Sequence, residues 1–294
     1  MIVRFLTIQP FLHIATQAET YLEPGMILLN EQEYPFTPGQ TIGELAAACK
    51  PAADIFILNG FPAQSGTLIQ DGDSCSLIER GAKLTDNEID ALLSARHTPG
   101  IHQQIRTSTI AILGLGGLGS AVAGAMAKIG IGKMLLSDYD VVEPSNLNRQ
   151  HYFVDQIGML KTSALQENLL RMNPSLSLQL IEEQLTESRL PELFSKVDVL
   201  IECFDTPVMK AATLRSVLSK MVDVAYVGSS GMAGFGENNT IVTRMLRPGV
   251  YIVGDAISEA APGMGLMAPR VGIAAHHQAN QALRILLGEA PKRN

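Results

Sequence analysis

The middle of the chain combines glycines and an acidic residue at spacings that suit a bound nucleotide. After the apolar run TIAIL come four glycines and then, 19 residues beyond the last of them, one acid: Gly114, Gly116, Gly117, Gly119 and Asp138. Glycines here let the backbone approach a phosphate, and a helix starting at the same point adds partial positive charge. An acid after the next strand can accept hydrogen bonds from ribose hydroxyls. The pattern predicts a nucleotide site. Tight strand–helix packing alone is the weaker explanation, because strand, helix and acid occur together.

The segment that follows this acid indicates which nucleotide is bound. It reads YDVVEPSNLNRQ and contains four amide or basic side chains: Asn146, Asn148, Arg149 and Gln150. A nicotinamide cofactor has no use for them, whereas a triphosphate needs cations. Lys161 begins a predicted helix, where a cation is unfavourable unless an anion lies nearby. We therefore expect Arg149 and Lys161 to neutralise the β- and γ-phosphates. The alternative is that both are ordinary surface residues.

Another acidic residue follows a second buried strand, in the sequence DVLIECFDTP. Asp205 would there face Asp138 and Asp140 across the edge of a parallel sheet. Proteins bind Mg²⁺ with one or two carboxylates together with phosphate oxygens and water, so Asp205 is the candidate metal ligand. Alternatively, Asp205 only precedes the next helix. ATP and Mg²⁺ are the cofactors that these residues indicate.

The elements that would position these residues divide the chain into four parts. They are an N-terminal extension (1–25), a ββαββ unit (26–81), a polar linker helix (82–108) and a region of alternating strands and helices (109–294). The alternation predicts an α/β domain with a Rossmann-like, largely parallel sheet covered by helices on both faces. In the ββαββ unit, Thr41 and Glu44 have the spacing of a capping box, which places a helix start there.

Composition narrows the classes of protein further. Hydrophobic residues make up 46% and charged residues 17% of the 294 residues, which predicts a folded protein. The net charge of -7 argues against a nucleic-acid partner. Three cysteines without a CxxC pair, Cys49, Cys75 and Cys203, argue against a disulfide framework and against zinc. No apolar run spans a membrane and no clean signal peptide is seen, so the expected location is cytoplasmic.

The motifs together resemble the ThiF/MoeB branch of the ubiquitin-activating-enzyme superfamily. The resemblance covers residues 96–288 and rests on GLGGLG, SNLNRQ, GMLK, MNP and ECFDTP, with the tail GDAISEAAPGMGLMAPRVGIAAHHQAN similar to a ThiF subgroup of thiamine biosynthesis. It implies an adenylyltransferase that uses Mg-ATP to activate the terminal glycine carboxylate of a sulfur carrier protein. The implied cofactor-binding residues are the four glycines, Asp138, Asp140, Asn146, Asn148, Arg149 and Lys161, with Asp205 for magnesium.

The resemblance also implies a homodimer in which an arginine reaches the partner's site. Arg96 is our candidate and Arg106 the second choice, and a solvated helix residue is the alternative for either. Many relatives carry two zinc-binding CxxC pairs and a cysteine that bonds to the carrier, and this sequence has neither. Cys203 falls within a buried strand, so we interpret it as a core residue and assign sulfur transfer to another protein.

Residues 26–81 resemble a sulfur carrier of the ThiS type, which has a ubiquitin-like β-grasp fold. Such carriers end in a free Gly-Gly, whereas this segment reaches Arg80, Gly81 and Ala82 and continues. We therefore interpret it as a fused docking or regulatory copy, and we expect the true carrier to be a separate chain. A thiocarboxylate found at Gly81 would overturn this interpretation.

Two adjacent histidines and a glycine-rich loop stand out in the C-terminal region. His276 and His277 are adjacent on a helix and point in different directions, so we assign them no metal site. The glycine-rich loop 254–269 is either a track for the carrier tail or a connector. The alternative functions are adenylation of a molybdopterin-type carrier or a tRNA carboxylate, an NAD-dependent oxidoreductase, and a noncatalytic scaffold.

Overall fold

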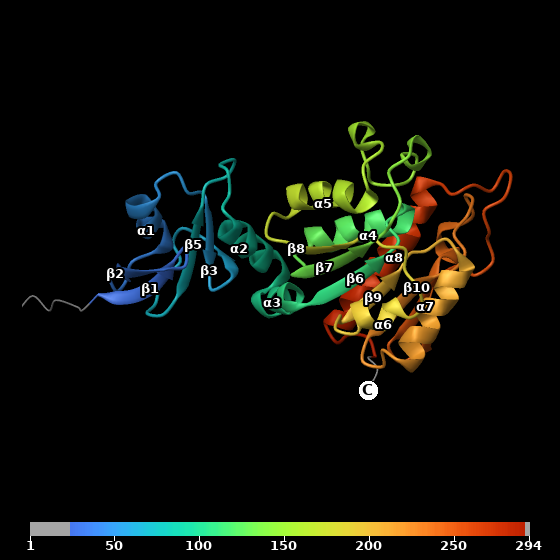
Figure 1. Cartoon of the computed structure of the whole chain (residues 1–294). Coiled ribbons are helices and arrows are strands. Elements are labelled where there is room, and N and C mark those ends of the chain that lie inside the picture. Colours follow the sequence, from blue (N-terminus) through green and yellow to red (C-terminus); the bar gives the residue numbers. More distant parts are fainter. Residues whose placement is uncertain (1–23, 292–294) are drawn as a thin grey trace, which may run out of the picture.

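The computed structural model describes residues 24–291, which form two separate sheets joined by a pair of helices (Figure 1). The predicted N-terminal extension, residues 1–25, lies outside the described residues apart from its last two positions. Within the described part of the chain, no helix is long and apolar enough to cross a membrane.

The first sheet has the arrangement of a ubiquitin-like β-grasp domain. Its elements are β1 (Gly25–Leu29), β2 (Gln32–Phe36), α1 (Ile42–Cys49), β3 (Ile55–Leu58), β4 (Phe61–Ala63) and β5 (Ser74–Ile78), in the strand order β2-β1-β5-β3-β4. Only the central β1–β5 pair is parallel. The capping box at Thr41 and Glu44 is confirmed and starts α1. The short strand β4 was not predicted, because its three residues FPA lack a period-2 pattern long enough to recognise.

Two helices connect the sheets where the sequence predicts one. They are α2 (Asp86–His97) and α3 (Pro99–Thr107), and the chain turns between them at Thr98, which has a φ of 69°. The predicted linker helix ends before Pro99, and the second helix was not predicted. Pro99 disfavours helical backbone in the residue before it but suits the first turn of a new helix.

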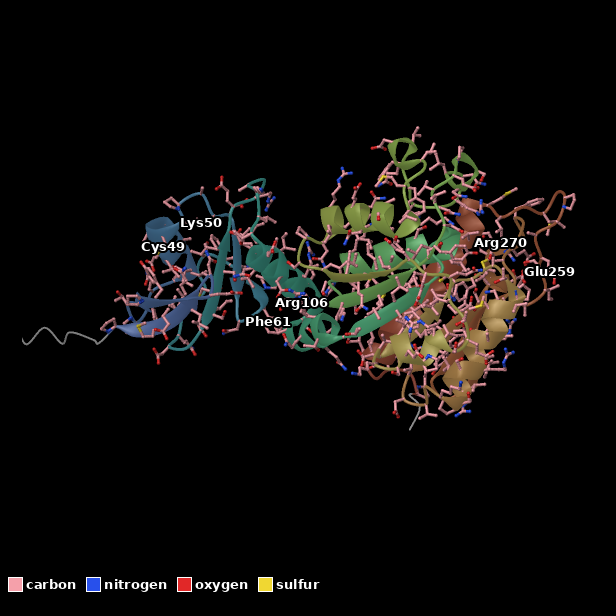
Figure 2. All side chains as sticks on the ribbon, in the orientation of Figure 1. Cys49, Lys50, Phe61, Arg106, Glu259 and Arg270 are labelled. Carbon is pink, nitrogen blue, oxygen red and sulfur yellow. The ribbon has the colours of Figure 1, made fainter. Side chains whose placement is uncertain are left out.

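Helix α2 packs on the β-grasp sheet, on the face opposite α1 (Figure 1). Ile57 and Ile78 belong to that face and are only 2% and 0% exposed. At one end of the helix, Lys50 Nζ lies 2.7 Å from Glu88 Oε1. Arg106, labelled in Figure 2, lies at the junction with the larger domain. Its Nε donates to Asp90 of α2 over 3.1 Å. The connecting helix is therefore part of the first domain's packing and not a free linker.

The second sheet has seven strands. The elements are β6 (Thr109–Leu113), α4 (Gly117–Lys128), β7 (Lys133–Ser137), α5 (Lys161–Met172), β8 (Ser177–Ile181), α6 (Arg189–Phe194), β9 (Val199–Glu202), α7 (Pro207–Ser219), β10 (Ala225–Ser229), β11 (Val242–Arg247), β12 (Val250–Gly254) and α8 (Ala268–Leu286). The strand order is β11-β12-β10-β9-β6-β7-β8, and all pairs are parallel except the edge pair β11–β12.

Helices cover both faces of this sheet, and each face has its own core cluster. Helices α4, α5 and α8 contribute to the larger cluster, while α6 and α7 contribute to the smaller one. The predicted Rossmann-like α/β class is confirmed. Because β6, β7 and β9 are parallel neighbours, their carboxyl ends meet at one edge, where open α/β sheets bind ligands.

Candidate active site

The turn between β6 and α4, together with the first turn of α4, requires glycine at two positions. Gly114 has a φ of +86°, and a Cβ at Gly119 would lie 1.9 Å from the carbonyl oxygen of Gly114. Helix α4 begins at Gly117, and no side chain among residues 24–291 caps it, so its first amides remain available to an anion. At Gly116 a Cβ would have only the amide nitrogen of Gln150 nearby, at 3.7 Å. This glycine turn, residues 114–117, therefore offers backbone that no side chain covers together with partial positive charge, and both fit a phosphate group.

Asp138 lies beside this turn at the end of β7. One carboxylate oxygen accepts from the amide of Leu115 at 2.7 Å, and the other accepts from the amide of Asp140 at 2.9 Å. Burial raises the pKa of Asp138, although the two amide hydrogen bonds and the positive charge of Lys161 act in the opposite direction. The carboxylate is thus held in a fixed orientation next to the glycine turn, as an acid for ribose hydroxyls requires.

Lys161 occupies the first position of α5, as predicted, and is 7% exposed. Its ammonium group lies 2.9 Å from Asp140 Oδ2 and 4.0 Å from Asp138 Oδ2. The anion that a cation at a helix start requires is therefore supplied within the chain by Asp140. The arrangement holds Lys161 at the carboxyl edge of the sheet, within reach of the acid beside the glycine turn.

The predicted polar loop lies against the start of α4. Asn146 is buried, and its side-chain oxygen accepts from the amide of Glu143, so its contact shapes the loop itself. Asn148 is exposed and accepts from Arg149 Nη1 at 2.8 Å. Arg149 and Asn148 line a hollow of about 200 Å³ together with Gly117, Gln150, Ala268 and four other residues. In that hollow Gln150 Oε1 is buried without a hydrogen-bond partner among the described residues, so it can accept a hydrogen bond from a ligand.

Asp205 follows β9 at the same edge, one strand away from the glycine turn. Its carboxylate is exposed, and within residues 24–291 it makes no hydrogen bond or ion pair. No group of three or more His, Cys, Asp or Glu side chains that could hold a metal ion occurs in the described part of the chain. A single free carboxylate fits a magnesium ion held mainly by substrate phosphates and water, and does not fit a closed structural metal site.

A buried ion pair lies beneath this edge of the sheet, and the sequence pattern did not predict it. Glu202, the last residue of β9, is 1% exposed and lies 3.0 Å from Lys210 Nζ of α7. Tyr226 donates to the same carboxylate, the amide of Phe204 donates to it at 2.7 Å, and Lys210 also donates to Ser229. The only sequence signal is a charged residue ending an apolar strand. The pair fixes the chain just before Asp205 to the ends of two strands.

Replacing Lys210 by methionine is expected to destabilise the fold by about 3 kcal/mol near neutral pH, because it leaves the Glu202 carboxylate buried without its cation. Burial raises the pKa of Glu202, and Lys210 partly offsets this, so the variant raises that pKa further. Below the unfolded-state pKa of about 4.5, Glu202 is protonated in both the folded and the unfolded protein. The loss of stability in the variant is therefore small at low pH and grows as the pH rises. Urea denaturation at pH 4.5 and 7.5 tests this, and an equal loss at both values would contradict it.

The two candidate arginines differ in their surroundings. Arg106 is engaged by Asp90 and by the carbonyl oxygen of Ser175. Arg96, in the last turn of α2, is exposed and makes no hydrogen bond or ion pair within residues 24–291. Cys203 is buried as expected, although it lies directly after β9 and not within it. Burial raises the pKa of its thiol, which disfavours the reactive thiolate form.

The fold is that of an α/β protein with a Rossmann-like sheet, and the chain also carries a ubiquitin-like domain. The chain belongs to the ThiF family, whose family model matches residues 91–294, and a ThiS-like ubiquitin model matches residues 26–81. The sulfur carrier protein ThiS adenylyltransferase of Escherichia coli is 29% identical over 192 residues, 63% of this chain and 75% of that protein. The molybdopterin-synthase adenylyltransferase of E. coli is 26% identical, over 63% of this chain and 76% of that protein.

One further relative matches a shorter part of the chain, and a solved structure matches a longer part. The ubiquitin-like modifier-activating enzyme 5 of Caenorhabditis briggsae is 33% identical over 138 residues, 42% of this chain, and the match spans about a third (32%) of that protein. Among solved structures, the E. coli tRNA N6-threonylcarbamoyladenosine dehydratase TcdA in complex with ATP has a TM-score of 0.63 and 20% identity. The match covers 71% of this chain and 98% of the TcdA chain. This likeness shows that the two proteins share a fold.

Proposed function

We propose that this protein is an ATP-dependent adenylyltransferase that activates the C-terminal glycine carboxylate of a separate ThiS-type sulfur carrier for thiazole synthesis in thiamine biosynthesis. The observation that carries the proposal is the convergence of the glycine turn, Asp138, Lys161 and Asp205 on one edge of the sheet. The names of the two E. coli relatives, both adenylyltransferases, support it. The ATP complex of TcdA supports the choice of nucleotide.

The chemistry needs positioning and charge stabilisation from the protein. The carrier's carboxylate oxygen attacks the α-phosphorus of ATP, a new phosphorus–oxygen bond forms, and pyrophosphate leaves with the electron pair of the broken bond. The glycine turn and the first amides of α4 bind phosphate oxygens, and Arg149 and Lys161 offset the charge that collects on the leaving pyrophosphate. Asp205 would hold Mg²⁺, which supplies further positive charge to the phosphates when bound.

The fused ThiS-like domain is not the substrate in this proposal. Gly81 is followed by Ala82 and then by α2, so the position equivalent to a carrier's end carries no free carboxylate. One face of the domain's sheet is already covered by α2. Both observations support the role of a docking or regulatory copy beside a separate carrier.

The direct test is ATP–pyrophosphate exchange with purified carriers. We expect exchange that requires ATP, Mg²⁺ and a ThiS-type carrier ending in Gly-Gly, and no exchange with a carrier lacking its last glycine. If only a molybdopterin-type carrier or a tRNA carboxylate supported exchange, the proposed substrate would be wrong and the proposed adenylation reaction would stand. Tight NADH binding with no ATP binding would overturn the proposal.

In the proposed homodimer, Arg96 reaches the partner's site. Replacing Arg96 by glutamine is expected to lower exchange by about 10²-fold, because one charge-stabilising donor is lost. Arg106→Gln is the matched control, which loses a contact within its own chain and retains activity to within a few-fold. Mixing Arg96→Gln with Lys161→Met chains should restore activity to about a quarter of the wild-type value, since heterodimers contain one complete site. No restoration on mixing would contradict an arginine acting between subunits.

A further inference from the structure

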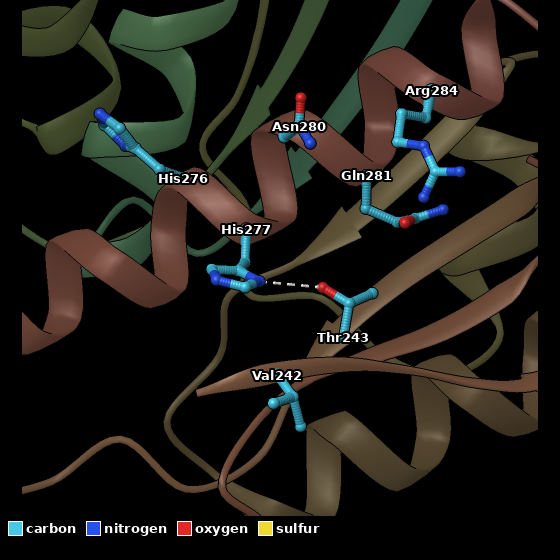
Figure 3. A pocket seen from close by; sticks show the side chains of 7 residues that line it. All are labelled: Val242, Thr243, His276, His277, Asn280, Gln281 and Arg284. Carbon is cyan, nitrogen blue, oxygen red and sulfur yellow. Dashed lines mark hydrogen bonds between the residues drawn. The ribbon is translucent and has the colours of Figure 1, made fainter. Parts of the chain in front are cut away.

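A second polar hollow lies between the edge strand β11 and helix α8. Its volume is about 480 Å³, and seven residues line it: Val242, Thr243, His276, His277, Asn280, Gln281 and Arg284 (Figure 3). None of these residues belongs to the glycine turn, the polar loop or the other groups of the candidate active site. The hollow needs an explanation of its own.

Gln281 is the observation that points to a ligand. The residue is 4% exposed, and its Nε2 is buried without a hydrogen-bond partner among residues 24–291. Figure 3 shows its amide extending from α8 on the side of β11, beside Arg284. A buried amide that lacks a partner is unfavourable and rare in folded proteins. An acceptor atom placed in the hollow would satisfy it.

The charges around Gln281 indicate which kind of acceptor fits. No Asp or Glu is among the lining residues. Arg284 is exposed, and among the described residues only its Nη2 makes a hydrogen bond, to the carbonyl oxygen of Glu289. Asn280 is exposed and makes no hydrogen bond within the described residues, while His277 is held against Thr243 by a 3.1 Å contact. The side chains that line the hollow therefore offer mainly hydrogen-bond donors, and one of them, Arg284, carries a fixed positive charge.

We propose that this hollow binds a small oxyanion, a carboxylate or phosphate group, which accepts from Gln281 Nε2 and pairs with the guanidinium of Arg284. The volume lies within the range of small-molecule sites, and a carboxylate or phosphate matches the planar fork of donors on arginine. The site is separate from the nucleotide site and does not depend on the adenylyltransferase activity.

The test is isothermal titration of the full chain with inorganic phosphate and, separately, with succinate. All titrations use an Arg149→Gln background, so that phosphate binding near the glycine turn contributes less. We expect one of the two probes to bind, which identifies the preferred anion, and we expect Gln281→Leu and Arg284→Gln each to weaken binding at least 10-fold. Arg171→Gln, which removes an exposed arginine on α5 that makes no hydrogen bond among the described residues, is the matched control and binds normally.

A stability measurement separates a ligand-binding role of Gln281 from a structural one. Gln281→Leu removes an unpaired buried amide at similar volume, so its Tm should equal or exceed that of the parent while anion binding is lost. Three results would overturn the proposal: no binding of either probe at 10 mM, equal weakening by Arg284→Gln and Arg171→Gln, or a dimer that Arg284→Gln converts to monomers without changing anion binding. The last result would identify the hollow as an interface between copies.

Discussion

Replacing Lys161 by methionine is expected to lower carrier-dependent ATP–pyrophosphate exchange by about 10²- to 10³-fold, the cost of removing one fixed charge-stabilising donor from a reacting phosphate site. The ammonium group lies 2.9 Å from Asp140 and 4.0 Å from Asp138, so carboxylates of the chain itself already hold it in place. A donor that is already oriented requires little rearrangement during the reaction. Methionine retains most of the volume of lysine, while it removes the charge and the ion pair with Asp140.

The control for this variant is Lys196→Met, which removes an exposed lysine between α6 and β9. It should exchange pyrophosphate at the wild-type rate. Measuring kcat and KM for ATP separately shows where Lys161 acts. A fall mainly in kcat supports charge stabilisation in the transition state, whereas an unchanged kcat with a raised KM would indicate ground-state binding only. Wild-type values of both kcat and KM would show that Lys161 does not act in the proposed site.

Replacing Asp205 by asparagine is expected to lower exchange by about 10²-fold at 1 mM Mg²⁺, because the proposed metal ligand loses its negative charge. Asp205 is exposed and makes no hydrogen bond or ion pair within the described residues, so the change should leave the fold intact. Raising the Mg²⁺ concentration should recover part of the activity. A titration of exchange rate against Mg²⁺ measures the shift in the concentration needed for half-maximal activity.

Asp223→Asn provides the comparison for Asp205, because Asp223 is also exposed and lies in the turn before β10, away from the glycine turn. Its Mg²⁺ dependence should match that of the wild type. An identical Mg²⁺ dependence for Asp205→Asn and Asp223→Asn would show that Asp205 does not contact the metal. The activity at saturating Mg²⁺ then distinguishes a general loss of function from a loss of metal binding.

Local sequence signals predicted the backbone of the candidate site. The spacing of Gly114 and Gly119 reflects a positive φ and a contact that leaves no room for a Cβ, both of which involve residues close in the chain. The capping box at Thr41 and the helix start at Lys161 are similarly short-range. The alternation of strands and helices was sufficient for the Rossmann-like class, because parallel strands require such connections.

The arrangement of side chains around that backbone depended on the tertiary structure. Asp140 supplies the anion beside Lys161 across 21 positions, and Lys210 and Tyr226 meet Glu202 from other elements. The hollow at Gln281 exists only because β11 lies beside α8. Propensities, caps and turns act over one to four residues and can be recognised in a sequence. Contacts between distant residues depend on how whole elements pack, and this packing is what placed two histidines and an unpaired amide around one hollow.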